Sequence, residues 1–139
     1  MLTETTSDVR YHVIRLNPGD DVLLSLREWV TLHSIQNATF VSGVGSLSRY
    51  HAHVVETTNL PPGNIFFKGE GAYDILTLTG MVIDGKVHAH IGFSDDKIAM
   101  GGHLEEGCTV LTFSIVTAVE LGDVRIGGWD TSGRHFSRG

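Results

Sequence analysis

The sequence has very little cysteine: Cys108 is the only one among 139 residues. A single cysteine cannot form a disulfide within the chain, so the fold does not depend on an oxidising compartment. No apolar run approaches the roughly 18 residues that a membrane-spanning helix needs. The N-terminus, MLTETTSDVR, also lacks the basic-then-apolar layout of a secretory signal. These absences predict a cytoplasmic protein with no membrane partner.

Positive charge is also scarce. The chain carries 10 Lys and Arg against 16 Asp and Glu, which gives a formal net charge of −6. Affinity for DNA phosphates needs clustered cations, whereas here they are scattered, with one local excess at residues 133–139 (GRHFSRG). A basic end of this kind is usually solvated. The composition therefore predicts a poor nucleic-acid binder.

What the sequence does have is the composition of one globular domain. A length of 139 residues is enough to bury a core but short for two domains. The chain is 41% hydrophobic and 19% charged, which is typical of folded proteins and not of disordered ones. We therefore expect a single folded domain.

One amphipathic helix is predicted, after a first strand. Residues 9–16 (VRYHVIRL) alternate in polarity and are rich in strand-forming residues. Turn residues follow, and Asp20 or Asp21 can cap the start of a helix. Apolar residues then recur at helical spacing, which predicts a helix from Asp21 to about Ile35.

Strand patterns fill most of the remaining chain. Asp84-Gly85-Lys86 is a strong hairpin signal, because Asp-Gly tolerates the positive φ values of a type I′ turn. The expected strands are 38–56 (two strands, joined or bent at glycines), 65–71, 73–83, 87–94 and 108–121. Together they predict an α+β domain with a central, largely antiparallel or mixed sheet of six to seven strands and one main amphipathic helix.

Two histidines share one face of a predicted strand. In VHAHIGFS, alternation puts His88 and His90 on the face opposite the apolar residues. A His-x-His pair supplies two imidazole nitrogens, which suit zinc, copper, iron and nickel. His103 is the best candidate for a third ligand, because Gly101 and Gly102 before it let the backbone approach closely. The pattern indicates a zinc-like site of His88, His90 and His103.

Nearby carboxylates extend this interpretation. Asp95, Glu105 and Glu106 are candidates to supply a ligand or to orient an imidazole from outside the ligand set. Spacing alone leaves a second interpretation open, because paired histidines on the polar face of a sheet are often hydrogen-bonded surface or interface residues. The pattern identifies no catalytic residue.

The remaining histidines and the cysteine give weaker signals. His51 and His53 form a second His-x-His pair, but Val55 continues their face, so we interpret this pair as cross-strand packing or an interface. Cys108 begins a buried strand and is interpreted as a small core residue. Three further histidines are isolated in the sequence: His12, His33 and His135.

Several motifs, in order along the chain, resemble those of the plants-and-prokaryotes conserved (PPC) domain. This is a domain-of-unknown-function family related to the C-terminal domain of plant AT-hook nuclear-localised proteins. The matching stretches are GVGSLS, ILTLTGMV and VHAHIGFSD…MGGHLEEGCTV, and the last is the most specific. The resemblance covers residues 9–121, so we expect a loose or disordered stretch at 1–8 and a Gly-rich C-terminal segment at 122–139.

The resemblance implies a largely antiparallel α+β fold assembled as a homotrimer. It also implies that the histidines corresponding to His88, His90 and His103 hold a metal in prokaryotic members. In plants the domain follows AT-hook segments that bind DNA. Bacterial relatives are called DNA-binding proteins because of this relationship to the plant proteins. This sequence has no Arg-Gly-Arg-Pro hook, which agrees with its unfavourable charge.

Three functions follow from these observations. The leading one is a small oligomeric binding module that holds zinc or a similar divalent ion. The second is a metal-dependent hydrolase, in which three nitrogens leave a position for a water of pKa ~7 and Glu105 or Glu106 acts as general base. The third is the DNA-binding or regulatory role that the family label carries. The resemblance identifies no established catalytic activity.

Overall fold

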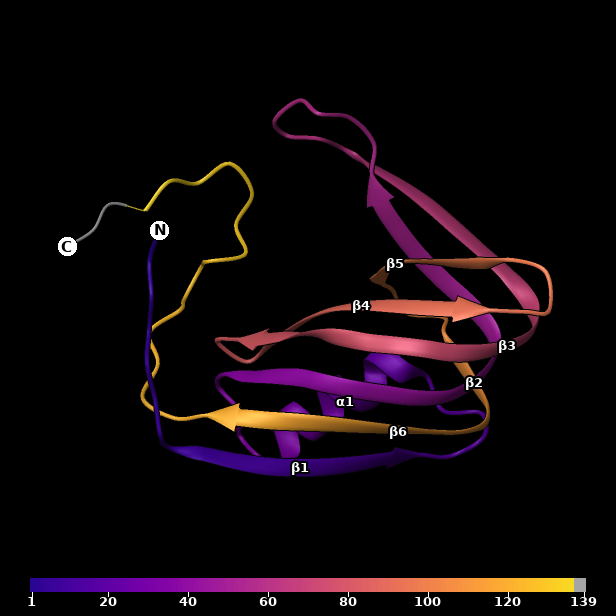
Figure 1. The fold of residues 1–139 in the computed structure, drawn as a ribbon, viewed down its shortest axis with the longest axis horizontal. Helices are drawn as coiled ribbons and strands as arrows, with labels where there is room; N and C mark the ends of the chain where they lie inside the picture. The colour runs from indigo at the N-terminus through magenta and orange to yellow at the C-terminus, as the bar shows by residue number, and fades with distance from the viewer. Residues whose placement is uncertain (137–139) are drawn as a thin grey trace.

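The protein folds into a six-stranded sheet with one α-helix, as seen in a computed structural model that describes residues 1–136 (Figure 1). All strand pairings are antiparallel, and the strand order is β1-β6-β2-β3-β4-β5. The elements are β1 (Val9–Leu16), α1 (Val22–Leu32), β2 (Ala38–Val55), β3 (Asn64–Ile83), β4 (Lys86–Ser94), β5 (Ala99–Leu104) and β6 (Thr109–Leu121). The α+β architecture predicted from the sequence is confirmed.

Strands β2 and β3 are longer than the sequence pattern indicated. Residues 38–56 contain one bent strand of 18 residues, and the separate strands predicted at 65–71 and 73–83 are one strand of 20 residues. Bulges bend these strands without ending them, because a bulge shifts the register at one place and pairing resumes on both sides of it. At Gly45, φ is +135° and an added Cβ would lie 2.7 Å from Ser114 Cα.

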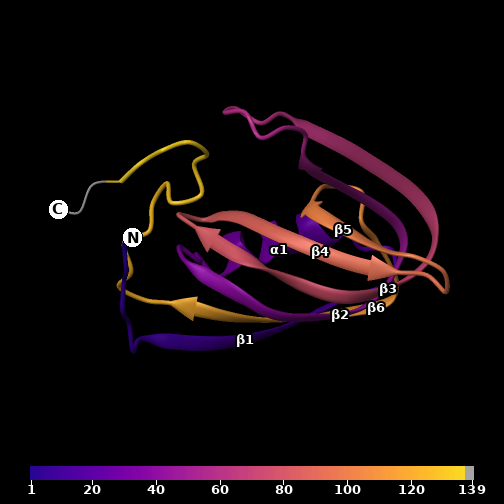
Figure 2. The ribbon, with the colours of Figure 1, turned by 45° about the horizontal axis from the view of Figure 1, so that its top comes forward.

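The short strand β5 closes one end of the sheet on itself. It pairs with β4 through His90 and His103, and with β2 through His53 and His103. A Cβ at Gly101 or Gly102 would lie 2.5 Å from a carbonyl oxygen of β4 or β2, so only glycine allows this approach. Figures 1 and 2 both show β5 beside β4, at the end of the strand order remote from β1. The close approach of the backbone that the sequence predicted at Gly101 and Gly102 is therefore observed.

Helix α1 covers one face of the sheet and buries the core against it. It begins after Asp21, as predicted, and the Oδ1 atom of Asp21 accepts a hydrogen bond of 3.0 Å from the backbone N–H of Leu24. It ends at Leu32, three residues before the predicted Ile35. Among the described residues, no helix has the length and apolar character that a bilayer crossing requires. Large side chains of the core include Leu26, Trp29, Phe40, Leu78 and Phe93.

The opposite face of the sheet carries exposed apolar side chains. Along β1 and β6 they lie on the face opposite the partly or fully buried side chains, so they point away from the core. Exposed apolar surface of this kind marks a candidate contact site. Exposed members on β1, β2 and β6, with 39–74% of their surface accessible, are Tyr11, Val13, Val44, Leu111 and Phe113.

Candidate metal centre

Four histidine side chains from three strands lie together where β5 closes the sheet. His53 lies in β2, His88 and His90 in β4, and His103 in β5. Pairing places His103 opposite His53 on one side and opposite His90 on the other, and His88 shares the face of His90. The ring centroid of His103 lies 4.3 Å from that of His53, 4.8 Å from His88 and 5.7 Å from His90. We call these four residues the histidine cluster.

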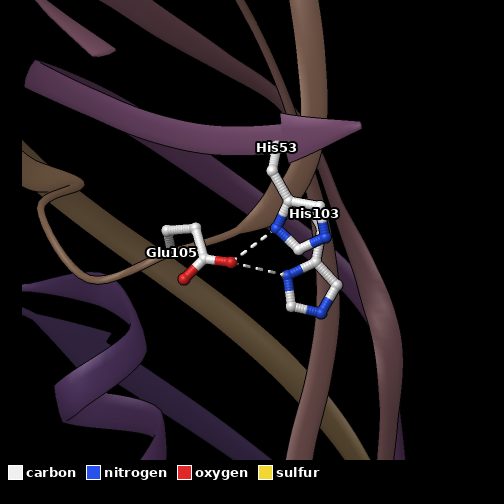
Figure 3. A group of neighbouring side chains, drawn as sticks. All are labelled: His53, His103 and Glu105. Carbon is white, nitrogen blue, oxygen red and sulfur yellow. Dashed lines mark hydrogen bonds and ion pairs between the residues drawn. The ribbon is translucent and has the colours of Figure 1, made fainter. Parts of the chain in front are cut away.

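All three histidines predicted as metal ligands belong to this cluster. The ring centroids of His88, His90 and His103 lie 4.8–5.7 Å from one another. The tightest set of candidate ligand atoms is a different one. Within residues 1–136, His53, His103 and Glu105 form the group of three whose ligand atoms all lie within 4.8 Å of one another (Figure 3). Among the described residues, the ligand atoms of His88, His90 and His103 do not form a group as tight as this one, although both sets share His103.

His53 is the member of the cluster that sequence reasoning missed. Its ring does pack, stacking on His103 at an interplanar angle of 24° and lying 5.1 Å from the ring of Phe66. Its place beside the other imidazoles, however, depends on the pairing of β2 with β5, which are far apart in the sequence. No local pattern reveals such a pairing. His51, by contrast, uses its Nδ1 atom to contact the backbone carbonyl of Glu106 at 2.7 Å.

Glu105, a predicted supporting residue, does lie beside two rings of the cluster. Its Oε1 atom is 2.5 Å from Nδ1 of His53 and 3.4 Å from Nδ1 of His103 (Figure 3). A carboxylate beside Nδ1 favours the tautomer that carries its proton there, so Nε2 keeps the lone pair that a metal needs. Glu105 is thus placed to orient imidazoles of the cluster.

A second carboxylate, Asp130, reaches the cluster from the C-terminal segment. Its Oδ2 atom lies 3.1 Å from Nδ1 of His88. Sequence reasoning missed Asp130, because it stands in an irregular Gly-rich stretch that gives no signal for where the chain runs.

The other two predicted supporting carboxylates have partners elsewhere. Asp95 lies in the turn between β4 and β5, where its Oδ1 atom accepts hydrogen bonds of 2.8 Å from the backbone N–H groups of Lys97 and Ile98. The N–H groups of Ile98 and Lys97 lower the pKa of Asp95. The side chain of Glu106 forms an ion pair with Arg27 on α1. The structure therefore brings Glu105 to the histidines, but not Asp95 or the side chain of Glu106.

Cys108 is fully buried just before β6, as its interpretation as a core residue predicted. Burial raises the pKa of its thiol to about 11. Because the thiolate is the form that binds metals, Cys108 is a poor ligand at neutral pH. The candidate ligands are therefore imidazoles and carboxylates alone.

The lowered pKa values of two members of the cluster, His90 and His103, favour metal binding. Partial burial lowers the pKa of His90 and of His103, and the neighbouring imidazoles His88 and His53 lower both further. Glu105 opposes this effect at His103. Imidazoles with lowered pKa values are neutral at physiological pH and keep a lone pair for an ion.

Three cavities adjoin the cluster, so small ligands can reach the rings. One, of about 580 Å³, is lined by all four histidines of the cluster together with Val54, Val55 and Pro62. A second, of about 530 Å³, is lined by Arg27, Thr31, Lys86, His88, His103 and Asp130. A smaller one, of about 200 Å³, is lined by His88, His90 and Asp130 among others.

We predict that acid destabilises the metal-free protein through His90 and His103. Histidine in an unfolded chain titrates near pH ~6.5, and both residues have lower pKa values in the folded state. Between the two values the unfolded chain binds more protons, so the free energy of unfolding should fall as the pH drops from neutral through ~6.5 toward the lower pKa values of the folded state. Urea denaturation should show a smaller fall in His90→Gln than in the wild type. An equal pH dependence in both proteins would contradict this explanation.

Comparison with known proteins places the chain in a family. The profile of the Plants and Prokaryotes Conserved (PCC) domain matches residues 3–122. A curated relative, the bifunctional protein GlmU of Synechococcus sp. (strain JA-3-3Ab), is 30% identical over 108 residues, which make up 77% of this chain. The match covers only 16% of that relative, so this chain spans a small part of its length.

Three solved structures share the fold. A plant- and prokaryote-conserved (PPC) protein from Pyrococcus horikoshii is 21% identical with a TM-score of 0.72, over 88% of this chain and 87% of that one. A metal-containing protein from Archaeoglobus fulgidus is 19% identical with a TM-score of 0.70, over 81% and 79% of the two chains. A putative DNA-binding protein from Ralstonia eutropha JMP134 is 24% identical with a TM-score of 0.66, over 81% and 78%. The profile match over most of the chain confirms the resemblance seen in the motifs: this protein belongs to the Plants and Prokaryotes Conserved (PCC, also written PPC) domain family.

Proposed function

We propose that this protein binds a divalent, zinc-like metal ion in the histidine cluster. The observation that carries the proposal is the gathering of four imidazoles from three strands, with the centroid of His103 within 5.7 Å of the other three. Neutral imidazoles are ligands that zinc and similar ions prefer. The likeness of fold to the metal-containing protein from Archaeoglobus fulgidus lends further support.

An unpaired nitrogen within the cluster supports the alternative ligand set that includes His53. Nδ1 of His103 is buried and makes no hydrogen bond to any described residue, although Oε1 of Glu105 lies 3.4 Å away. Buried polar atoms are normally satisfied by a partner. An ion between His53, His103 and Glu105 would account for this atom, whereas the set of His88, His90 and His103 would leave Nδ1 of His103 facing Glu105.

In the proposed site, His88, His90 and His103 supply three nitrogens and Glu105 orients His103. Three protein ligands leave a fourth position for water or another ligand. A bound zinc ion would supply Lewis acidity and lower the pKa of such a water. The hydrolase alternative would draw its general base from Glu105, because the side chain of Glu106 is already paired with Arg27.

We do not propose DNA binding, although the Ralstonia relative carries that label. The chain has a formal net charge of −6. Two of its cations also face carboxylates, since Arg27 pairs with Glu106 and Arg49 with Glu70. Phosphate contacts need cations that are free to neutralise the nucleic acid.

We also propose that the protein assembles as a homotrimer through the exposed apolar face of β1 and β6. Sedimentation equilibrium should then give three times the chain mass of 15.1 kDa. Val13→Glu, which places a charge on this face, should lower the measured mass. Leu32→Glu is the matched control, because Leu32 is 72% exposed at the end of α1 and Val13 is 74% exposed. A monomeric wild type, or equal effects of the two variants, would contradict the proposed interface.

The metal ligands are tested by the zinc affinity of the protein purified without an affinity tag. We expect about one ion per chain. Removing a ligand in His88→Ala or His90→Ala should weaken binding by more than the roughly 100-fold that loss of an outer partner costs. His53→Ala should have a smaller effect, because we assign His53 to stacking on His103. Competition with a fluorescent zinc chelator measures these affinities.

A histidine outside the cluster, His51, provides the matched control for these zinc affinities. His51→Ala removes an imidazole that lies outside the cluster and should bind zinc like the wild type. If His53→Ala and Glu105→Ala abolish binding while His90→Ala retains it, the ion occupies the alternative set that includes His53, and the proposed ligand assignment is wrong. A wild type that takes up no zinc would contradict the proposed function itself.

A further inference from the structure

The C-terminal segment, residues 122–136, returns to the histidine cluster after β6 ends. Nearly all of it lies beyond residues 3–122, the part of the chain that matches the family. It leaves β6 at the end of the sheet where the hairpin joins β3 to β4 (Figure 1). This hairpin leads directly into the part of β4 that carries His88.

The segment has defined anchors on both sides of Asp130. Ile126 is buried, with 6% of its surface exposed. The backbone N–H of Trp129 donates to the carbonyl of Ile126 at 3.1 Å. The N–H of Thr131 donates to the carbonyl of Gly128 at 3.0 Å. Because these overlapping turns enclose Asp130, its backbone is held in place by local hydrogen bonds.

From this position Asp130 contacts His88 at the nitrogen that the proposed site does not need for the ion. Oδ2 of Asp130 lies 3.1 Å from Nδ1 of His88, and the two side chains are 34% and 37% exposed. A carboxylate there favours a proton on Nδ1, leaves Nε2 free as a ligand and raises its basicity. Glu105 lies in a similar place beside His103, at 3.4 Å from Nδ1 and without a hydrogen bond, but it belongs to the family domain.

We propose that Asp130 is a positioning residue of the metal centre, and that a segment outside the family domain therefore completes the site. This inference rests on the proposed metal-binding function. It adds that His88 binds the ion through Nε2 in the tautomer whose Nδ1–H donates to Asp130. The affinity of this chain for zinc then depends on a residue that the domain alone does not supply.

The test measures zinc affinity of full-length Asp130→Ala and Asp130→Asn by competition with a fluorescent chelator. Loss of the carboxylate in Asp130→Ala should weaken binding about 10–100-fold, as is typical for outer partners of metal ligands. Asp130→Asn should lose less, because its amide oxygen still accepts a hydrogen bond from Nδ1–H. Asp123→Asn is the matched control: it removes the same charge from the same segment and should bind like the wild type.

A second readout separates positioning from a structural role. In ¹H–¹⁵N spectra of the metal-free protein, His88 should carry its proton on Nδ1 in the wild type and shift toward the Nε2–H tautomer in Asp130→Ala. The urea midpoint of the metal-free protein should not change. A lowered midpoint without a change of tautomer would mean that Asp130 acts only on folding, which would overturn the inference.

The outcomes also separate this inference from the proposed function. Zinc binding by the wild type with equal affinity in Asp130→Ala would overturn the role of Asp130 and leave the metal centre intact. A wild type without zinc binding would contradict the proposed function, and the role of Asp130 with it.

Discussion

The close approach of β5 to strands on both of its sides is the constraint on which the rest of the site depends. Gly101 and Gly102 allow it, because carbonyl oxygens of β4 and β2 lie where their side chains would begin. One short strand can then pair on both edges and carry His103 between His53 and His90. The curvature that closes the sheet and the gathering of imidazoles are therefore one structural feature.

Electrostatics determine the state in which such a cluster is stable. Partial burial penalises protonated imidazoles, and at these separations they would also repel one another, so the pKa values of His90 and His103 are lowered. Glu105, whose Oε1 atom lies beside Nδ1 of His53 and of His103, opposes this effect by raising the pKa of His103. His90 and His103 are thus already in the neutral form that metal binding requires, and an ion need not displace protons from these two rings.

Features that depend on neighbouring residues in the sequence could be predicted. Features that depend on pairing between distant strands, or on the path of the C-terminal segment, could not. Strand alternation gave the shared face of His88 and His90, and capping chemistry gave the start of α1 at Asp21. His53 and Asp130 were missed because they reach the cluster through a β2–β5 pairing and a returning terminal segment. Strand β5 itself is short and carries two glycines, which weaken any strand signal. Asp95 was a candidate supporting residue, but its carboxylate accepts hydrogen bonds from the backbone of the turn that it starts. Asp is a common residue at the start of a turn, so the sequence did indicate this local role.

The central claim is that strand closure aims the imidazoles of β4 and β5 at a single ion. X-ray absorption at the zinc edge of the loaded, full-length protein tests it most directly. The account predicts a first shell with three imidazole nitrogens at ~2.0–2.1 Å and the outer-shell scattering of imidazole rings. A first shell made of oxygen atoms, without imidazole scattering, would contradict it and place the ion away from the histidine cluster.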